Sequence, residues 1–171
     1  MLRRQVFAFC LVSLFAFYSC QKEDTSSKSP EPNPSGSVVT NVDQATLLQL
    51  VNDTRQSGCI CGSTVMPPVA PVTWNDQLAS AALVHSNDMN SKNYFSHTGS
   101  NGSSAGDRIT AAGYTWKAYG ENIAKGHPTE KAVIDGWLTS EGHCKNIMSP
   151  FMKEMGAARV GSYWTQELGS R

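Results

Sequence analysis

The order in which two kinds of periodicity follow one another constrains the fold of this chain most. Apolar residues recur at helical spacing in three segments, which begin near residues 43, 75 and 129. Near the C-terminus, residues 155–160 and 163–168 flank Gly161-Ser162, a pair typical of a two-residue β-hairpin turn. Helical segments followed by a hairpin predict an α+β fold built in layers.

Residues that commonly cap helices stand at the starts of the three predicted helices. Asp43, Asn75 and Thr129 carry side-chain oxygens that can accept hydrogen bonds from the first free backbone N–H groups. A further short helix is expected around residues 107–112. Residues 58–72 contain glycines and prolines, which predict an irregular loop held by a crosslink.

The second predicted helix has an apolar face that includes a histidine. His85 lies on this face with Leu78 and Met89. Because a buried histidine usually satisfies its ring nitrogens with one or two hydrogen bonds, we interpret His85 as a core residue rather than a ligand.

Length and charge exclude several classes of function. The chain has 171 residues, with 14 lysines and arginines against 14 aspartates and glutamates, so its formal net charge is zero. This length suits one domain, and the balanced charge lacks the basic footprint that nucleic acids require. The sequence also lacks a glycine-rich phosphate loop and a Gly-x-Ser-x-Gly nucleophile elbow.

The N-terminus is typical of an export signal. Arg3 and Arg4 precede an apolar run over residues 6–17, which is short for a membrane span. Cys20 follows a small residue at the end of this run, as at a bacterial lipoprotein cleavage site. We therefore predict a signal peptide over residues 1–19 and lipidation of Cys20; the alternative is an ordinary signal peptide with an incidental cysteine.

The next segment predicts a tether. Residues 20–41 are rich in serine and proline and nearly empty of large apolar side chains, so they are expected to form a flexible, lipid-anchored linker to a domain over residues 42–171. Lys22-Glu23-Asp24 resembles the acidic signal that carries Bacteroidetes lipoproteins to the outer face of the outer membrane; the alternative is a merely soluble linker. The expected location is the cell envelope, as an outer-membrane lipoprotein exposed at the surface, with the membrane as partner.

The cysteines fit an oxidising compartment. Cys10 lies in the predicted signal and Cys20 would carry lipid, which leaves Cys59, Cys61 and Cys144 in the domain. Three thiols allow one disulfide and leave one thiol unpaired. A zinc site is the alternative, but the ligand pairs of structural zinc sites usually stand two to four residues apart, which favours the disulfide.

Five short motifs follow one another along residues 85–166. They are His85-Ser86-x-x-Met89, Phe95-Ser96-His97, Gly120-Glu121-Asn122-Ile123-Ala124, Gly142-His143-Cys144-x-Asn146-Ile147-Met148 and Tyr163-Trp164-Thr165-Gln166. In this order and spacing they resemble the CAP superfamily, also called SCP-like or cysteine-rich secretory, antigen 5 and pathogenesis-related domains, in its short bacterial form. The resemblance implies a three-layer α-β-α sandwich with a small antiparallel sheet and an open cleft on one side.

The resemblance also implies a set of cleft residues. In eukaryotic members the cleft holds two histidines and two glutamates that can take a divalent metal. His97 matches the first histidine and Glu121 the first glutamate, and each is expected at a turn. Ser140 stands where the second glutamate is expected, and Tyr163-Trp164 where the second histidine is expected. We infer that His143 substitutes for that histidine.

Two further expectations concern residues outside this set. Related bacterial sequences, as the resemblance suggests, keep the Cys61-Gly62 pair together with Gly-His-Cys. This implies a free Cys59 and a disulfide between Cys61 and Cys144, which would tie the loop after the first helix to a Gly-His-Cys turn. His127 stands between Gly126 and Pro128 ahead of a helix start, and is expected on an exposed loop away from the cleft.

The cleft residues allow two interpretations. His97, Glu121 and His143 could bind a divalent metal such as zinc and leave one position for water, as in hydrolytic sites. The alternative is a polar network in which the same groups satisfy one another without metal. The first predicts a metal-dependent hydrolase of envelope polymers or peptides. The second predicts a protein that binds lipid, cell-wall material or another protein through its cleft, and we expect this function first.

Overall fold

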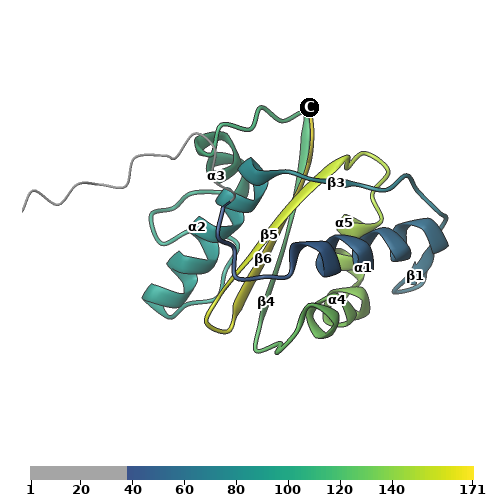
Figure 1. The fold of residues 1–171 in the computed structure, drawn as a ribbon, viewed down its shortest axis with the longest axis horizontal. Coiled ribbons are helices and arrows are strands. Elements are labelled where there is room, and N and C mark those ends of the chain that lie inside the picture. Colours follow the sequence, from purple (N-terminus) through teal and green to yellow (C-terminus); the bar gives the residue numbers. More distant parts are fainter. Residues whose placement is uncertain (1–37) are drawn as a thin grey trace, which may run out of the picture. The chain divides into compact units, whose positions relative to one another are not determined.

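A four-stranded sheet lies between two sets of helices in the part of the chain that the structure describes (Figure 1). This computed structural model describes residues 38–171. The predicted signal peptide, Cys20 and residues 20–37 of the predicted tether lie outside the described residues.

The helices and strands alternate irregularly along the chain. The helices are α1 (Gln44–Ser57), α2 (Asp76–Lys92), α3 (Ala105–Ala111), α4 (Glu130–Thr139) and α5 (Glu141–Ile147). The strands are β1 (Cys59–Cys61), β2 (Thr64–Met66), β3 (Thr73–Trp74), β4 (Ala118–Lys125), β5 (Glu154–Val160) and β6 (Tyr163–Ser170). No helix within residues 38–171 has both the length and the apolar character needed to cross a membrane.

The sheet has the strand order β3-β5-β6-β4. β5 and β6 form the predicted hairpin around Gly161-Ser162, and β4 pairs antiparallel with the other side of β6. The short β3 pairs parallel with β5. In this register Glu121 lies directly opposite Glu167, and Asn122 lies opposite Gln166. β1 and β2 form a separate two-stranded hairpin.

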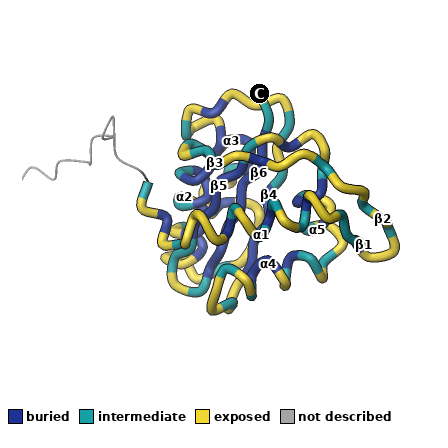
Figure 2. The backbone as a smooth tube through the Cα atoms, turned by 45° about the vertical axis from the view of Figure 1, so that its right-hand side comes forward, coloured by how far each residue is buried: buried dark blue, intermediate teal, exposed yellow. Residues whose placement is uncertain are grey.

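The two faces of the sheet are covered by different helices. α2 and α3 lie over one face, and α1, α4 and α5 lie over the other (Figure 1). The larger apolar cluster lies on the second face and includes Val51 of α1, Trp137 of α4, Ile147 of α5, and Trp164 and Leu168 of β6. Because both faces are covered, every residue of β6 except Ser170 is buried (Figure 2).

Arg55 ties α1 to segments far along the chain. Its side chain is fully buried and donates hydrogen bonds to the backbone carbonyls of Ala70, Ile147, Ser149 and Met152. Four carbonyl acceptors satisfy the buried guanidinium. This one side chain therefore fixes the segment that follows β2 and the segment that follows α5 against α1.

The predicted α+β class and the three-layer arrangement are confirmed. Asp43, Asn75 and Thr129 cap α1, α2 and α4 through their side chains, as expected. The short helix begins two residues earlier than expected, because Ser104 caps it and forms a reciprocal capping box with Asp107.

Three local expectations were wrong. Residues 58–72 contain the hairpin of β1 and β2 rather than irregular loop alone. The Glu121 segment is the strand β4 rather than a turn, because it pairs along its whole length with β6. The Gly-His-Cys segment is the helix α5, whose Cys144 and Ile147 pack into the core. In each case long-range pairing or packing outweighs the local preference of glycine and asparagine.

Candidate functional site

A buried carboxylate on β4 is held between a histidine and an arginine. His97 Nδ1 lies 2.6 Å from Glu121 Oε1, and Arg108 Nη2 lies 2.5 Å from Glu121 Oε2. The side chains of Glu121 and Arg108 are 4% and 5% exposed, whereas that of His97 is 58% exposed. The His97 ring therefore faces solvent, whereas the charged groups of Glu121 and Arg108 behind it are buried.

The loop that carries His97 is anchored to α2 by a second carboxylate. Asp88 accepts hydrogen bonds from the backbone N–H and the hydroxyl of Ser100, and from the hydroxyl of Tyr94. Burial alone would raise the pKa of Asp88, but these hydrogen bonds outweigh it and lower that pKa to about 2. The carboxylate therefore stays ionised and holds the loop.

Arg108 of α3 fixes the same loop from the other side. Its guanidinium donates to the backbone carbonyls of Ser103 and His97 as well as to Glu121. An arginine can serve three acceptors at once because its donors form a rigid planar fork. The position of His97 is therefore set by α2, α3 and β4 together.

His85 is a core residue, as predicted, but it also borders this group. Its ring is fully buried, and its Nε2 lies 2.9 Å from the carbonyl of Ser96 and 3.8 Å from Glu121 Oε2. Burial lowers the pKa of His85, with the charge of Arg108 acting in the same direction and that of Glu121 against it. A neutral ring donates to the Ser96 carbonyl and packs behind Glu121.

Glu167 is the residue of this group that the sequence analysis missed. It lies opposite Glu121 on β6, is fully buried, and neither carboxyl oxygen accepts a hydrogen bond from the described residues. Burial and the charge of Glu121 raise its pKa well above the usual range. A protonated Glu167 has an O–H that can donate to Glu121 on the neighbouring strand.

The two carboxyl groups therefore differ in charge. Burial would raise the pKa of Glu121 too, but the hydrogen bond from His97 and the charge of Arg108 outweigh it and lower that pKa. The hydrogen bond to Glu121 also raises the pKa of His97, so this ring gains a proton more readily than a free histidine. The site thus combines an ionised Glu121 with a neutral Glu167.

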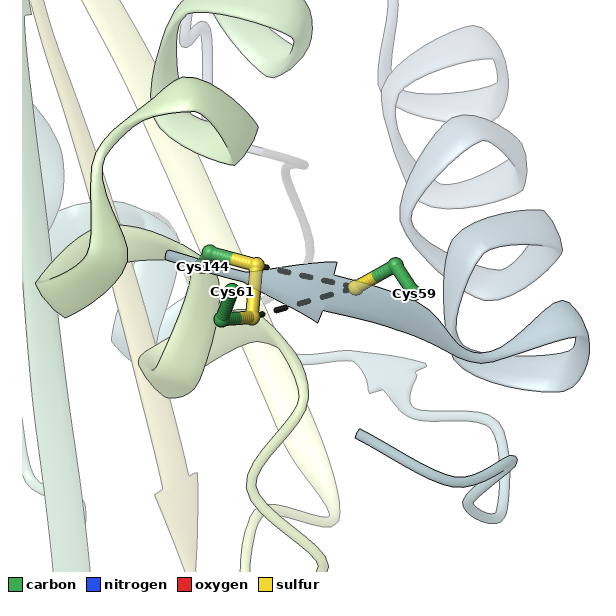
Figure 3. Close-up of side chains that lie close together, drawn as sticks. All are labelled: Cys59, Cys61 and Cys144. Carbon is green, nitrogen blue, oxygen red and sulfur yellow. Dashed lines mark hydrogen bonds between the residues drawn. A yellow bond between two sulfur atoms is a disulfide. The ribbon is translucent and has the colours of Figure 1, made fainter. Parts of the chain in front are cut away.

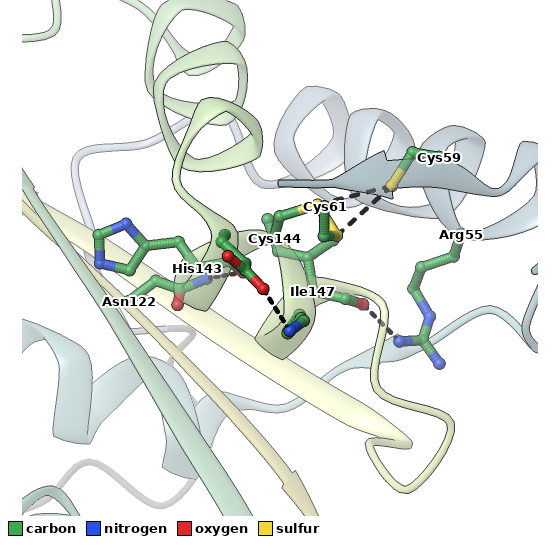
Figure 4. Close-up of a disulfide and its surroundings, with 9 residues drawn as sticks. Arg55, Cys59, Cys61, Asn122, His143, Cys144 and Ile147 are labelled. Carbon is green, nitrogen blue, oxygen red and sulfur yellow. Dashed lines mark hydrogen bonds and ion pairs between the residues drawn. A yellow bond between two sulfur atoms is a disulfide. The ribbon is translucent and has the colours of Figure 1, made fainter. Parts of the chain in front are cut away.

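His143 does not join this group directly. It lies on α5, and its backbone carbonyl accepts a hydrogen bond from Asn122 (Figure 4). Because successive residues of a strand point to opposite faces, the side chain of Asn122 lies on the sheet face opposite that of Glu121. No hydrogen bond or ion pair within residues 38–171 links the His143 ring to His97 or Glu121. Its pKa is lowered first by burial and then by the charge of His97, so the two rings lie within electrostatic reach.

The donors at this site do not fit a bound metal ion. Both oxygens of Glu121 are engaged, one by His97 and the other by the permanent positive charge of Arg108. A cation at Glu121 would have to displace these partners and face the guanidinium at close range. His97, Glu121 and His143 also do not form a compact ligand set. No choice of one ring nitrogen from each histidine and one carboxylate oxygen from Glu121 brings all three atoms within 4.8 Å of one another. The arrangement is that of a polar network.

His127 lies on the loop between β4 and α4, but it is half-buried rather than exposed. Its ring fits over Gly136 of α4, where an added Cβ would meet a ring carbon at 2.6 Å. Its carbonyl accepts a hydrogen bond from Trp164 Nε1 at 2.9 Å. The missing side chain of Gly136 leaves the space that this ring fills.

Two surface hollows adjoin Arg108. One of about 380 Å³ lies between α2 and α3 and is lined by Val84, Asp107 and Ala111 among others. The second, of about 280 Å³, is more polar and is lined by Asn87, Asp88 and neighbouring loop residues. Arg108 lines both hollows, whereas His97, Glu121 and His143 line neither.

The implied disulfide is confirmed. Cys61 of β1 is bonded to Cys144 of α5 across 83 residues of sequence. Cys59 is the free cysteine of the described chain, and its sulfur lies beside the bridge (Figure 3). The bridge joins the β1–β2 hairpin to the helix that carries His143.

Comparison with known proteins gives consistent matches. The chain is 33% identical to the uncharacterized protein YkwD of Bacillus subtilis over 154 residues, which are 85% of this chain and 56% of YkwD. It is 34% identical to the uncharacterized membrane protein YlbC of the same bacterium over 103 residues, which are 60% of this chain and 30% of YlbC. The chain thus spans about half or less of the length of these relatives.

Solved structures share the fold. An extracellular protein containing an SCP domain from Bacillus anthracis has a TM-score of 0.67 and 28% identity, covering 84% of this chain and 45% of that one. An outer surface protein from Borrelia burgdorferi has a TM-score of 0.64 and 17% identity, covering 74% of this chain and 91% of that one. The model of the cysteine-rich secretory protein family matches residues 48–168. The chain therefore belongs to the CAP family of cysteine-rich secretory proteins.

Proposed function

We propose that this CAP-domain protein acts outside the cell, at the bacterial envelope, and binds a ligand through the exposed ring of His97. The ligand would be a lipid, cell-wall material or a protein that presents a hydrogen-bond acceptor such as a carboxylate or phosphate. The observation that carries the proposal is the engagement of His97 Nδ1 by the buried Glu121, with more than half of the His97 side chain left exposed.

The chemistry of this pair favours binding over hydrolysis. Glu121 accepts a hydrogen bond from His97 Nδ1 and holds the ring in one orientation, so Nε2 is directed outward. The hydrogen bond to Glu121 favours the protonated ring, in which Nε2–H is a donor of fixed direction. Arg108 and Glu167 surround Glu121, which is therefore shielded from a substrate and poorly placed as a general base. The hollows beside Arg108 provide surface for the remainder of a ligand.

The proposed location is supported by the solved relatives. One of them is described as an extracellular protein and another as an outer surface protein. Cys20 would attach the protein to the membrane through lipid, and residues 20–39 would link it to the domain, because Thr40 is already buried and accepts a hydrogen bond from the Arg159 backbone.

A binding comparison between two histidine variants tests the site. Purified protein would be incubated with peptidoglycan fragments and with phosphatidylglycerol vesicles, and the bound fraction measured. We expect His97→Ala to weaken binding about ten- to a hundredfold, the value of one charge-assisted hydrogen bond. His127→Ala is the control, because His127 makes its contacts with α4 and Trp164 instead. If His97→Ala and His127→Ala bound every probe equally well, His97 would not be part of the binding site.

Cell fractionation tests the anchor separately. We expect Cys20→Ser to abolish retention in the membrane fraction, because no acyl chain can then be attached, while the domain stays folded. The folded state would be checked by the circular dichroism of the released protein. Retention of the variant after a salt wash would exclude lipid on Cys20 as the anchor.

A further inference from the structure

Three cysteine sulfurs meet at one place, where β1 packs against α5. Cys59 Sγ lies 3.6 Å from Cys144 Sγ and 3.8 Å from Cys61 Sγ, and the latter two are joined as the disulfide (Figure 3). Among the histidine, cysteine, aspartate and glutamate side chains of residues 38–171, these three are the set whose ligand atoms all lie within 4.8 Å of one another. Strand alternation puts Cys59 on the same face of β1 as Cys61, and the fold brings its sulfur about equally close to that of Cys144.

The separations from Cys59 are those of sulfurs that share a metal ion. A zinc–sulfur bond of about 2.3 Å and a tetrahedral angle place two ligand sulfurs about 3.8 Å apart. Cys59 already has this separation from both partners. The sulfurs of Cys61 and Cys144 would have to separate by rotation about the Cα–Cβ bonds of the two residues, whose Cα atoms are 5.5 Å apart.

The surroundings suit such a centre. Cys61 and Cys144 are fully buried and Cys59 is half-buried, so the sulfurs are shielded from bulk water and reached from the side of Cys59. Cys59 and Cys61 stand on the short strand β1, and Cys144 stands on α5. The His143 ring points away from the sulfurs (Figure 4), which leaves a fourth coordination position for water.

We propose that Cys59, Cys61 and Cys144 form a three-thiolate site for Zn²⁺ when the disulfide is reduced. A dithiol reductant transfers two electrons and two protons to the Cys61–Cys144 bond, which yields two thiols, and the dithiol closes to a cyclic disulfide. Binding of Zn²⁺ then releases three protons, one from each cysteine. The same three residues are thus a crosslink under oxidising conditions and a site for a thiophilic cation under reducing ones.

Zinc titration of the whole mature protein tests this site. The disulfide would be reduced with a phosphine, which does not compete as a thiolate ligand, and complete reduction would be verified by counting alkylated cysteines. Zn²⁺ would be added in competition with a chromophoric chelator. We expect the reduced protein to bind one equivalent per chain and the oxidised protein to bind none at this site.

Two variants assign the binding to the sulfurs. Since loss of an outer partner of a metal ligand already costs about 10–100-fold in affinity, reduced Cys59→Ser should bind Zn²⁺ at least about tenfold more weakly. His97→Ala is the matched control and should bind like the wild type, which separates this site from the His97 group. If reduction unfolds the protein, Zn²⁺ should refold the wild type but not Cys59→Ser.

Three results would overturn the proposal. They are equal zinc affinity of reduced wild type and reduced Cys59→Ser, absence of binding to either, and resistance of the bridge to the phosphine in the folded protein.

Discussion

At the scale of single residues, two carboxyl groups lie opposite each other in the protein interior, which is costly for the fold if both are charged. Glu121 and Glu167 face each other on neighbouring strands and are both buried. Two negative charges on directly paired residues in the interior would repel each other and destabilise the fold, so only Glu121 is ionised. Arg108 and His97 compensate its charge. Because Glu167 is the neutral member of the pair, the free energy of unfolding should depend on pH in a way that can be measured.

Glu167→Gln is expected to change how stability depends on pH. Because the folded state raises the pKa of Glu167, the folded protein holds a proton that the unfolded chain releases above the ordinary glutamate pKa of 4.5. The free energy of unfolding of the wild type therefore falls as pH rises from that value toward the raised pKa, by at most about 1.4 kcal/mol per pH unit. The glutamine of the variant cannot ionise, so this fall in the free energy of unfolding should be absent from Glu167→Gln.

Urea unfolding of both proteins between pH 5 and pH 9 measures the effect. The difference in stability should grow in favour of Glu167→Gln as the pH rises. Parallel curves for the two proteins would show that Glu167 is already ionised in the fold.

At the scale of elements, the close approach of α2 to the sheet depends on a glycine. An added Cβ on Gly156 of β5 would lie 2.0 Å from the backbone nitrogen of Ala79. No rotation of a side chain can relieve a clash with backbone, so α2 would have to move away from β5. Since α2 also carries His85 and Asp88, its distance from the sheet sets the position of the His97 loop.

Gly156→Ala is therefore expected to destabilise the protein by about 3 kcal/mol, the upper part of the range for an overpacked core. Gly142→Ala in α5 is the matched control, because its added Cβ meets nothing within 4 Å. Alanine there should stabilise the helix by about 0.5–1 kcal/mol. Chemical unfolding at constant pH measures both, and a neutral Gly156→Ala would mean that the two layers are loosely packed.

At the scale of the whole molecule, the disulfide and Arg55 join segments that are distant in sequence. Both connect the region of α1 and β1 to the region around α5. A crosslink over 83 residues restricts the unfolded chain strongly, which in the chain-entropy model stabilises the fold by about 4 kcal/mol.

Cys144→Ser should lower the free energy of unfolding under oxidising conditions by about this 4 kcal/mol. Cys144 is the residue to replace, because Cys59 lies close enough to pair with it in place of Cys61. Cys59→Ser is the control and should leave stability nearly unchanged, since Cys59 belongs to no disulfide. Similar losses in the two variants would argue that the sulfur cluster acts through packing instead.

The sequence by itself determined the features that rest on local chemistry. Asp43, Asn75 and Thr129 cap helices because a side-chain oxygen needs only the next few residues to act. The final hairpin follows from Gly161-Ser162 between two strand-forming runs. The family motifs added the fold and the disulfide between Cys61 and Cys144.

Only the tertiary structure decided how the site is composed. Glu121 was expected at a turn, but it lies on the strand β4. Both faces of the sheet are covered there, and β4 directs Glu121 to one face and Asn122 to the other. The alternation of apolar and polar residues that marks an ordinary strand is therefore absent. Arg108 and Glu167 reach Glu121 from α3 and β6 through pairings that no local pattern encodes. His143 stays apart from Glu121 because successive strand residues point to opposite faces, and α5 packs on the face of Asn122.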